Sequence, residues 1–406
     1  MSNPVALFEA GHLDEATRLL ETDPAHKKNY QAWLLLATCK QAREKYDEAG
    51  WAINMACALD PTSPAINYFY IQHLLARGQI KTGINLWRQY LIMLKACPLS
   101  NPKNIWDGVS DLNNKTMAVA MNYKWGQGDQ IHFGRYIKLL KMKYPRVKIC
   151  LFGSNSLKRL FLENQVADAF FDPADESSAP TEGFTLDYYA DLLLLGAFLA
   201  KDYQRQEPFV YLKAGEAVSD ELKAAVQNQP RGQAKVAFVY NGAARAYAKR
   251  RDINNIEDLK TIFLQNPQIQ FYCLQKEAGD ADFAGLDNVT TLGPLLSDFY
   301  DTAFVLEQMD AVVTVETAAA ALASAMGKEV HLISRVDYCW RFHTYQGRSL
   351  WFDNLISYRH EGKPQWPVIF DQIGHNLRER FPASEVYEFP LPSDQSLPFD
   401  SLEART

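Results

Sequence analysis

The spacing of apolar residues changes along the chain. In the first hundred residues they follow helical patterns, with one face apolar and the other polar. From residue 116 onward, short apolar runs typical of buried strands alternate with helical segments. In this first α/β stretch we predict strands at 117–122, 147–152 and 169–172, and helices at 130–143, 156–164 and 186–200. Strand and helix in alternation indicate a parallel, doubly wound sheet.

The same alternation starts again after a polar stretch at 215–232. Here we predict strands at 235–240, 269–274, 289–292, 311–314 and 329–333, and helices at 256–265, 297–309 and 317–326. Two similar α/β halves in tandem, each opening with a strand and a glycine-containing loop, predict two facing Rossmann-like domains, the architecture called GT-B. A ligand site is then expected in the cleft between them, at the C-terminal edges of both sheets.

The helical first part repeats itself. The tetrapeptide Leu13-Asp-Glu-Ala16 recurs 33 residues later as Tyr46-Asp-Glu-Ala49, and a weaker copy, Ile80-Lys-Thr-Gly83, follows after another 34. A period near 34 with a proline closing the second helix resembles tetratricopeptide repeats. Because a single helix pair cannot bury its apolar face, neighbouring pairs must stack, and a region this short is expected to pack on the α/β part of the chain. The alternative is a plain helical bundle.

These patterns divide the chain into segments. Residues 97–115 are rich in Pro, Asn, Ser and Asp and lack helical period, which is typical of a linker. The predicted order is a short repeat region at 1–96, a linker at 97–115, a first Rossmann-like domain at 116–214 and a second at 215–345. A segment at 346–384 follows, whose helix is expected to cross back to the first domain, as is common in GT-B proteins. The chain then continues as an extended tail at 385–406. The predicted fold class is therefore α plus α/β.

Composition and charge exclude several classes of protein. Of the 406 residues, 47% are hydrophobic and 22% charged, which is ordinary for a folded soluble protein, and the net charge of −6 argues against nucleic acid as a partner. No N-terminal signal pattern occurs, and the apolar run at 191–200 is too short to span a bilayer. The six cysteines are scattered without C-x-x-C spacing, so we expect reduced thiols and a cytoplasmic location.

The stretch 117–136 carries the clearest candidate chemistry. A β-type run leads into a turn with Gly126 and Gly128, and a helix then opens with Asp129 in its first turn. A helix start offers free backbone N–H groups and a positive dipole end to an anion, and glycines let a ligand approach the backbone closely. Asp129 would then stand at the C-terminal edge of a sheet. The alternative is that Gly-x-Gly only turns the chain into an ordinary βα unit.

Four separated motifs resemble those of a known family. The run from Gly126 to Tyr136 resembles the opening loop of the heptosyltransferase-like glycosyltransferases that carry an N-terminal tetratricopeptide region, in which G-x-G-D-x-I-x-F-x-R-Y is common. Segments 241–253, 315–328 and 337–341 resemble, in the same order, this family's loop after the first strand of the second domain, its V-D-T helix and its D-W-R-W-like element. The similarity covers nearly all of the chain beyond the repeats.

The resemblance implies a metal-independent, inverting glycosyltransferase with a nucleotide-sugar as co-substrate and no other cofactor. The sugar would go to a hydroxyl of a protein or a glycan, with the repeats recruiting or orienting a protein acceptor. Asp129 would be the general base, whereas its alternative role is a helix-start carboxylate favoured by the dipole. Trp125, Gly126, Gly128 and His132 would form the acceptor-side loop, and the alternative for His132 is packing in the core.

The donor side is expected in the second domain. Arg245, Lys249 and Arg251 follow Gly242 on a basic loop that would bind a diphosphate, because guanidinium groups bind phosphate through parallel hydrogen bonds. The alternative is a solvated basic loop, which is the commoner role of a charge run.

A strand is expected to meet a helix at Glu316 and Thr317. Thr317 at the helix start would give a second anion platform, and Glu316 would accept a hydrogen bond from a ribose or sugar hydroxyl or, alternatively, cap the helix. None of the eight histidines has metal-ligand spacing, so no metal is expected.

The chain departs from the family at several donor-side positions. Glu316 stands in place of Asp, Ala318 in place of a Ser-like residue, Ala321 in place of His, and Arg245-Ala246 in place of a His-Lys pair. Polar groups are thus lost, so either the donor differs or none binds. The rival hypothesis is a catalytically degenerate GT-B-like protein that acts as a binding or scaffold module through its repeats. A sugar-phosphate isomerase or epimerase is a third and weaker hypothesis, because such enzymes need no repeats.

Overall fold

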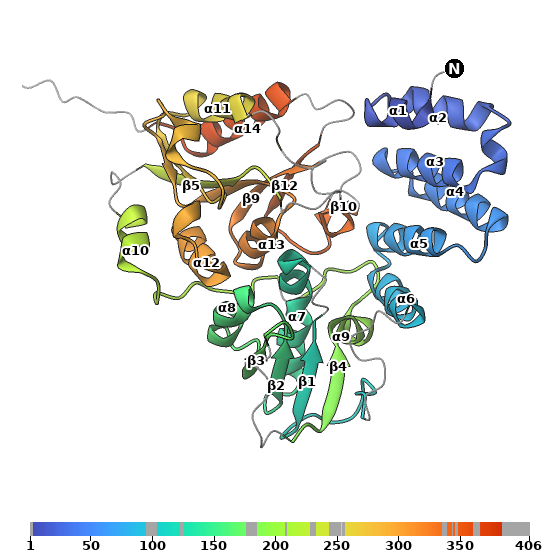
Figure 1. Ribbon diagram of the computed structural model, residues 1–406, viewed down its shortest axis with the longest axis horizontal. Helices are drawn as coiled ribbons and strands as arrows, with labels where there is room; N and C mark the ends of the chain where they lie inside the picture. The colour runs from blue at the N-terminus through green and yellow to red at the C-terminus, as the bar shows by residue number, and fades with distance from the viewer. Residues whose placement is uncertain are drawn as a thin grey trace, which may run out of the picture.

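The computed structural model shows a helical region beside two α/β domains (Figure 1). This confirms the predicted order of a helical first part followed by parallel-sheet α/β domains. The structure describes residues 3–94, 104–121, 126–175, 185–207, 209–227, 233–242, 253, 256–334, 339–342, 344–345, 348–359 and 366–383. No helix in these ranges combines the length and the apolar character that crossing a bilayer requires.

The helical region consists of paired helices. They are α1 (Pro4–Glu9), α2 (Leu13–Thr22), α3 (Tyr30–Ala42), α4 (Tyr46–Leu59), α5 (Pro64–Ala76) and α6 (Ile80–Met93), with the short η1 (His26–Lys28) between α2 and α3. Helices α2, α4 and α6 begin at Leu13, Tyr46 and Ile80, which are the first residues of the repeated tetrapeptides. Ala16 and Ala49 are fully buried because neighbouring helices approach closely there. The tetratricopeptide class itself stays a prediction.

The first domain is built on a four-stranded parallel sheet in the order β3-β2-β1-β4. Its elements are β1 (Thr116–Ala120), α7 (Gln127–Lys143), β2 (Lys148–Phe152), η2 (Asn155–Leu157), α8 (Lys158–Glu163), β3 (Ala169–Phe171), β4 (Tyr188–Asp191) and α9 (Leu192–Leu199). The single helix predicted at 186–200 is wrong in its first part, since Tyr188 to Asp191 pair with β1 as a strand. Helix α9 starts only after Asp191, whose side chain caps it by accepting from the Leu194 N–H at 2.7 Å.

The second domain has a six-stranded parallel sheet in the order β12-β9-β8-β5-β6-β7. Its strands are β5 (Ala234–Val239), β6 (Ile269–Cys273), β7 (Val289–Thr291), β8 (Ala311–Val315), β9 (Glu329–Ser334) and β12 (Leu355–Arg359), and a small hairpin joins β10 (Thr344–Tyr345) to β11 (Arg348–Ser349). Its helices are α10 (Asp220–Gln227), α11 (Ile256–Gln265), α12 (Phe299–Glu307), α13 (Ala318–Ala325) and α14 (Trp366–Arg380), with η5 (Asp280–Phe283), η6 (Gly293–Leu295) and η7 (Trp340–Phe342). Helices α11 and α14 cover one face, and α12 and α13 cover the other (Figure 1).

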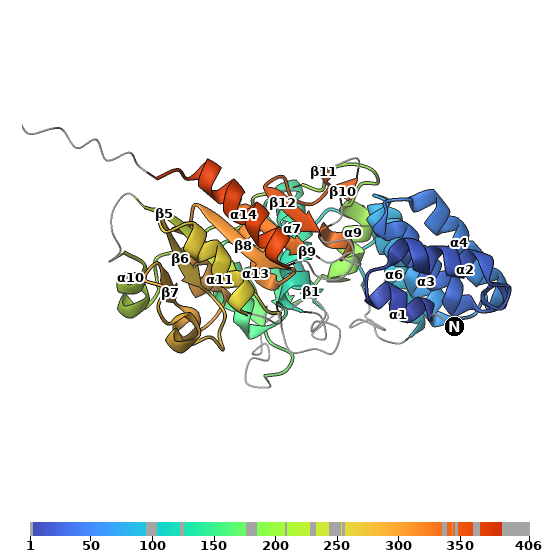
Figure 2. The ribbon, with the colours of Figure 1, turned by 90° about the horizontal axis from the view of Figure 1, so that it is seen from above.

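The last helix does not lie where we expected it. Instead of crossing back to the first domain, α14 packs on α11 of the second, and Figures 1 and 2 both show the two helices side by side. The return contact is made by the residues just before β12. The Leu350 carbonyl accepts from the Gln206 N–H at 2.8 Å, and Asp353 forms an ion pair with Arg205.

The predicted linker also differs in its second half. Trp106 is 1% exposed, and its backbone N–H donates to the backbone carbonyl of Tyr189 on β4 at 2.9 Å. Residues 104–115 therefore pack on the first sheet, because a buried tryptophan and a strand-edge bridge from Ile105 fix them there. The first half of the predicted linker and the predicted tail beyond 383 lie outside the described residues.

The helical region packs on the α/β domains, as we expected. Helix α6 lies against α9, and Figure 2 shows the helical region at one end of the molecule next to that helix. Arg88 on α6 pairs with Asp191 at 2.8 Å, and Glu44 between α3 and α4 pairs with Arg359 on β12 at 2.6 Å. One continuous apolar core includes residues of α5, α6, both sheets and the segment before β12. The helical region, through α5 and α6, therefore has a fixed position relative to both domains.

Candidate active site

The topology of the sheets defines where a ligand would bind. In each sheet the first strand lies in the middle, and the chain moves to one side of it for two strands and then to the other side. Ligands of open α/β sheets bind at this switch point, beyond the carboxyl ends of the strands. After β1, Gly126 caps α7, and Gly128 and Asp129 lie in its first turn; the loop after β8 carries Glu316 and Thr317. The predicted residues therefore stand at the switch points of both sheets.

The starts of two helices from different domains meet at this place. A side chain placed at Gly128, in the first turn of α7, would bring its Cβ within 3.3 Å of the Cα of Ala318, the first residue of α13. Figure 1 likewise shows one end of α7 next to α13, and the two helices are in contact. Thr317 caps α13, and its hydroxyl lies 3.0 Å from that of Thr314 and accepts from the Ala320 N–H at 3.4 Å. Two positive dipole ends thus converge on one point.

Asp129 forms an ion pair there with Arg341, which comes from η7 of the second domain. The side chain of Arg341 is 16% exposed and that of Asp129 is 25% exposed. The guanidinium lies over the Trp340 ring at 4.6 Å and near the Trp87 ring at 6.0 Å, and its Nη1 donates to the Cys339 Sγ at 2.8 Å. Burial disfavours its charge and is the largest single influence, but the attractions of Asp129, Cys339 and Tyr68 together outweigh burial and raise the pKa of Arg341.

Glu316 positions the segment that carries Arg341. Its side chain is buried, and both carboxylate oxygens accept from the Cys339 N–H, at 3.1 and 3.2 Å. Such a charge-assisted contact fixes the backbone one residue before η7. The structure thus gives Glu316 a supporting role at the site, and the predicted contact with a ribose or sugar hydroxyl stays a prediction.

His132 is not at the surface of the acceptor-side loop, where we placed it. It is fully buried, with its ring 4.0 Å from that of Trp351 and 5.7 Å from that of Trp340. Burial, followed by the nearby charges of Arg135 and Arg341, holds its pKa well below the ordinary value. His132 is therefore neutral and packs as a core residue, because the face of α7 that carries it is covered by the segment before β12.

Sequence reasoning missed Arg135, which is fully buried on α7. Its Nη1 donates to the carbonyls of Gln206 and Trp351, each at 2.9 Å, and its Nε donates to the His132 carbonyl at 2.9 Å. The guanidinium also lies over the Phe352 ring at 4.9 Å. Arg135 joins the helix that carries Asp129 to the interdomain connection and to the return segment. The sequence signal for it was its place as the Arg of the motif that runs from Gly126 to Tyr136.

The helical region also reaches the site, which the sequence did not predict. Trp87 on α6 makes edge contacts with Trp340 at 6.1 Å and with Phe133 at 6.2 Å between ring centroids. Helix α5 packs against η7, and Tyr68 on α5 lies in the electrostatic environment of Arg341. Aromatic side chains of the helical region therefore form one wall beside the Asp129–Arg341 pair.

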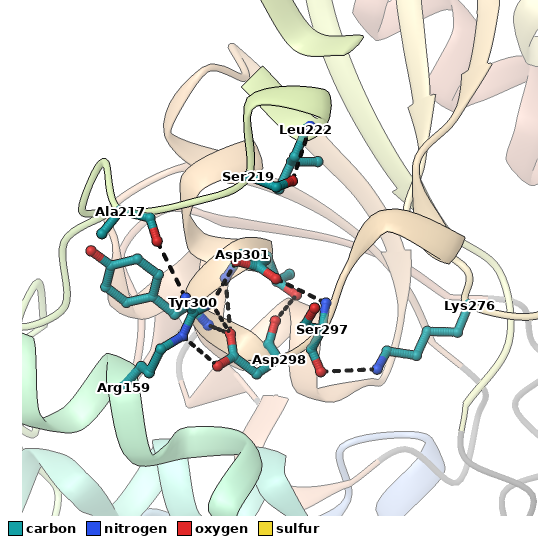
Figure 3. A network of polar contacts seen from close by, with 10 residues as sticks. Arg159, Ala217, Ser219, Leu222, Lys276, Ser297, Asp298, Tyr300 and Asp301 are labelled. Carbon is teal, nitrogen blue, oxygen red and sulfur yellow. Dashed lines mark hydrogen bonds and ion pairs between the residues drawn. The ribbon is translucent and has the colours of Figure 1, made fainter. Parts of the chain in front are cut away.

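A second polar contact between the domains lies away from Asp129 (Figure 3). Arg159 on α8 donates to both oxygens of Asp298, at 2.7 and 2.9 Å, and to Asp301 at 2.5 Å. It also donates to the Ala217 carbonyl at 3.2 Å, and its guanidinium lies 4.6 Å from the centre of the Tyr300 ring. Asp298 is the cap of α12, so the cluster ties α8 of the first domain to the start of a helix of the second.

Several predicted site residues lie outside the described residues, namely Trp125, Arg245, Lys249 and Arg251. Gly242 is described and follows β5, directly after Asn241, whose N–H donates to the Gln275 side chain at 3.1 Å. Within the described part of the chain, no His, Cys, Asp and Glu residues gather into a group that could hold a metal ion.

Comparisons with known proteins give likenesses of fold. No family model and no curated protein matches the chain. Among solved structures it is similar to the glycosyl transferase family 9 protein of Veillonella parvula DSM 2008, with a TM-score of 0.46 and 9% identity over 67% of this chain and 92% of that one. It is similar to the ADP-heptose lipopolysaccharide heptosyltransferase II of E. coli, with a TM-score of 0.45 and 14% identity over 66% and 99%.

A third similar structure also spans the helical region. This is a mutant O-GlcNAc transferase of Thermobaculum terrenum, with a TM-score of 0.31 and 13% identity over 93% of this chain and 90% of that one. At such identities a likeness concerns the fold alone. The class that the coordinates define is a helical region joined to two parallel-sheet α/β domains whose switch points face each other.

Proposed function

We propose that this protein is a glycosyltransferase that moves a sugar from a nucleotide-sugar to a hydroxyl of a protein or glycan, by a single inverting displacement without a metal ion. The observation that carries the proposal is the meeting of the α7 and α13 helix starts, one from each sheet, with Asp129 beside them. Helix starts favour a phosphate, and a carboxylate at a switch point can accept a proton from a bound hydroxyl.

In this proposal the residues have separate roles. Asp129 takes the proton of the acceptor hydroxyl while the oxygen of that hydroxyl attacks the anomeric carbon of the donor sugar. The bond from that carbon to the diphosphate breaks, and the diphosphate leaves with the electron pair. Arg341 and the N–H groups of α13 stabilise the departing charge, together with the basic residues of the loop after Gly242. Guanidinium and backbone N–H groups thereby do the electrostatic work that a metal ion does in other transferases.

The position of the helical region is an argument for a protein as the acceptor. Helices α5 and α6 contact η7 and the Trp340 ring, so a segment held by the helical region would lie next to Asp129. A cytoplasmic location is part of the proposal, because the cysteines of the described residues are all free thiols.

A second candidate function is a binding module without catalysis. Ala318 begins α13, and Ala321 is buried within it, at positions where the resembled family has polar residues. Such a protein would bind a nucleotide-sugar or a partner without turnover. The two candidates differ in whether a nucleoside diphosphate is released when an acceptor is added.

The test is a thermal-shift screen of nucleoside diphosphates and nucleotide-sugars on the wild type, Arg251→Ala and a surface control, Lys223→Ala. A ligand present at 100 times its Kd stabilises the folded state by about 2.7 kcal/mol. We expect one nucleotide to raise the melting midpoint of the wild type and the control but not of Arg251→Ala. If saturating concentrations of every compound leave the wild type unchanged, the proposal is wrong. Binding without release of diphosphate in the presence of candidate acceptors would favour the binding module.

A further inference from the structure

The proposed base is already occupied by a cation from the other domain. Arg341 Nη2 pairs with a carboxylate oxygen of Asp129 across the junction of the two domains. The pair engages one oxygen of a carboxylate that has two. If Asp129 is the base, as the proposed function has it, Arg341 competes with the proton of the acceptor hydroxyl for this carboxylate while the contact lasts.

Arg341 has hydrogen-bonding capacity that its present partners do not use. Of its contacts among the described residues, Asp129 is the only carboxylate, and Cys339 Sγ is a weak acceptor. Its buried Nε has no hydrogen-bonding partner in the described part of the chain. A diphosphate offers several charged oxygens and can engage two N–H groups of one guanidinium, which makes it a stronger acceptor than a single carboxylate oxygen.

The position of Arg341 is fixed independently of Asp129. Trp340 lies under the guanidinium and Trp87 beside it, while both oxygens of Glu316 hold the preceding backbone N–H of Cys339. Loss of the contact with Asp129 would therefore leave the guanidinium in place beside the first turn of α7, whose Gly128 lies next to the start of α13. An anion arriving at that helix start would find Arg341 within its reach.

From this geometry we infer that the Asp129–Arg341 pair is a contact that the donor displaces. The diphosphate of the nucleotide-sugar takes Arg341, and Asp129 becomes free to accept the acceptor proton. The donor therefore binds before the acceptor can react. When the sugar is transferred, the carbon–oxygen bond to the acceptor forms and the bond from the anomeric carbon to the diphosphate breaks. The acceptor proton is then on Asp129, and the diphosphate takes the electron pair and stays paired with Arg341 until it dissociates. This inference rests on the proposed function and adds the order of events and the exchange of Arg341 from Asp129 to the diphosphate.

The experiment measures the affinity of nucleoside diphosphates alone, by calorimetry, for the wild type, Asp129→Asn, Arg341→Gln and the double variant. Asp129→Asn removes the competing charge at constant size, so we expect it to tighten binding about three- to tenfold, the range of a differential interaction near 1 kcal/mol. Arg341→Gln should weaken binding at least tenfold. In the Arg341→Gln background, Asp129→Asn should change affinity less than twofold, because the competition runs through Arg341. Circular dichroism checks that each variant is folded, and Asp129→Ser provides a second test of the same competition.

Each outcome decides the inference. Equal tightening by Asp129→Asn in both backgrounds would show a general field effect of the lost charge and would overturn the displacement. Wild-type binding that Asp129→Asn and Asp129→Ser leave unchanged would also overturn it, while leaving the proposed function intact. If neither the wild type nor any variant binds a nucleoside diphosphate, both the inferred displacement of Arg341 from Asp129 and the proposed function are wrong.

Discussion

The Arg159 cluster provides the sharpest test of how the two α/β domains are held together. We expect Arg159→Gln to lower the free energy of unfolding, because the guanidinium is the common partner of Asp298 and Asp301 across the domain boundary (Figure 3). Glutamine keeps a polar side chain but loses the charge and the bidentate contact. Arg159 lies away from Asp129, so the substitution leaves the candidate site itself unchanged.

The size of the loss follows from exposure. Removal of one partner costs about 0 to 1 kcal/mol for an exposed pair and about 3 to 5 kcal/mol for a buried one. The Arg159 side chain is 43% exposed, while those of Asp298 and Asp301 are 16% and 8% exposed. Both carboxylates also keep backbone donors after the substitution, since Asp301 accepts from Ser297 and Asp298 caps α12. We therefore expect a loss of about 2 kcal/mol, after discounting for solvent screening.

The assay is urea unfolding, with Arg77→Gln as the matched control. Arg77 pairs with Asp47 within the helical region, where the side chains are 37% and 88% exposed, so its loss should cost at most about 1 kcal/mol. Added salt should narrow the difference in free energy of unfolding between wild type and Arg159→Gln only partly, because Asp301 is buried and the Asp298 side chain is only 16% exposed. Equal losses in the two variants would refute the reasoning that burial of the carboxylates makes this cluster important.

The same cluster predicts a dependence on pH. Burial alone would raise the pKa of Asp298, but its hydrogen bonds with Arg159 and with backbone N–H groups outweigh burial and lower the pKa. A lowered pKa means that the unfolded chain binds the proton first as the pH falls, so this contribution is complete above about pH 4 and is lost below it. Arg159→Gln should therefore flatten the fall in stability at acidic pH.

Two further predictions concern packing and a buried histidine. Gly128→Val should lower the free energy of unfolding by about 1 to 3 kcal/mol and abolish stabilisation by nucleotides, because its Cβ would meet Ala318 at 3.3 Å. Gly126→Val should do neither, since among the described residues its Cβ would come within 4 Å of Asp129 alone, at 3.9 Å; urea unfolding and thermal shifts check both variants. Burial lowers the pKa of His73 to about 4. The unfolded state therefore binds the proton first as the pH falls from about 6.5 to about 4, and the free energy of unfolding should fall by about 3 kcal/mol over this range. In His73→Gln, urea unfolding should show a smaller change of this free energy with pH.

Much of the fold could be predicted because buried parallel strands are short apolar runs with clear boundaries. Strands β5 to β9 lie within a residue or two of their predicted positions. Strand β4 was missed because it runs directly into the apolar helix α9, and no turn residue separates the two periods. Strand β12 follows the return segment in a stretch without helix–strand alternation, so only tertiary pairing with β9 defines it.

The candidate site divides in the same way. Residues that follow strands, such as Asp129 and Thr317, could be placed together because the topology of a doubly wound sheet brings strand ends to one edge. Arg341 was linked to the site only through the resemblance of segment 337–341, and its contact with Asp129 was not predicted. Trp87 was not linked to the site at all, because it lies in a separate helical region and no periodicity connects it with Asp129. The burial of Arg135 could not be predicted either, since the backbone carbonyls that accept from its Nη1 lie far along the chain.

The position of Trp87 changes how the helical region is understood. A repeat region that only recruits partners can be joined to an enzyme by a linker, and its orientation then has little effect on catalysis. Here Trp87 packs against Trp340 and Phe133, and Trp340 lies directly under the guanidinium that pairs with Asp129. A shift of α6 would therefore move η7 and change the contact between Arg341 and the proposed base. In the proposed transferase, the helical region both presents the acceptor and sets the geometry of the residue that receives its proton.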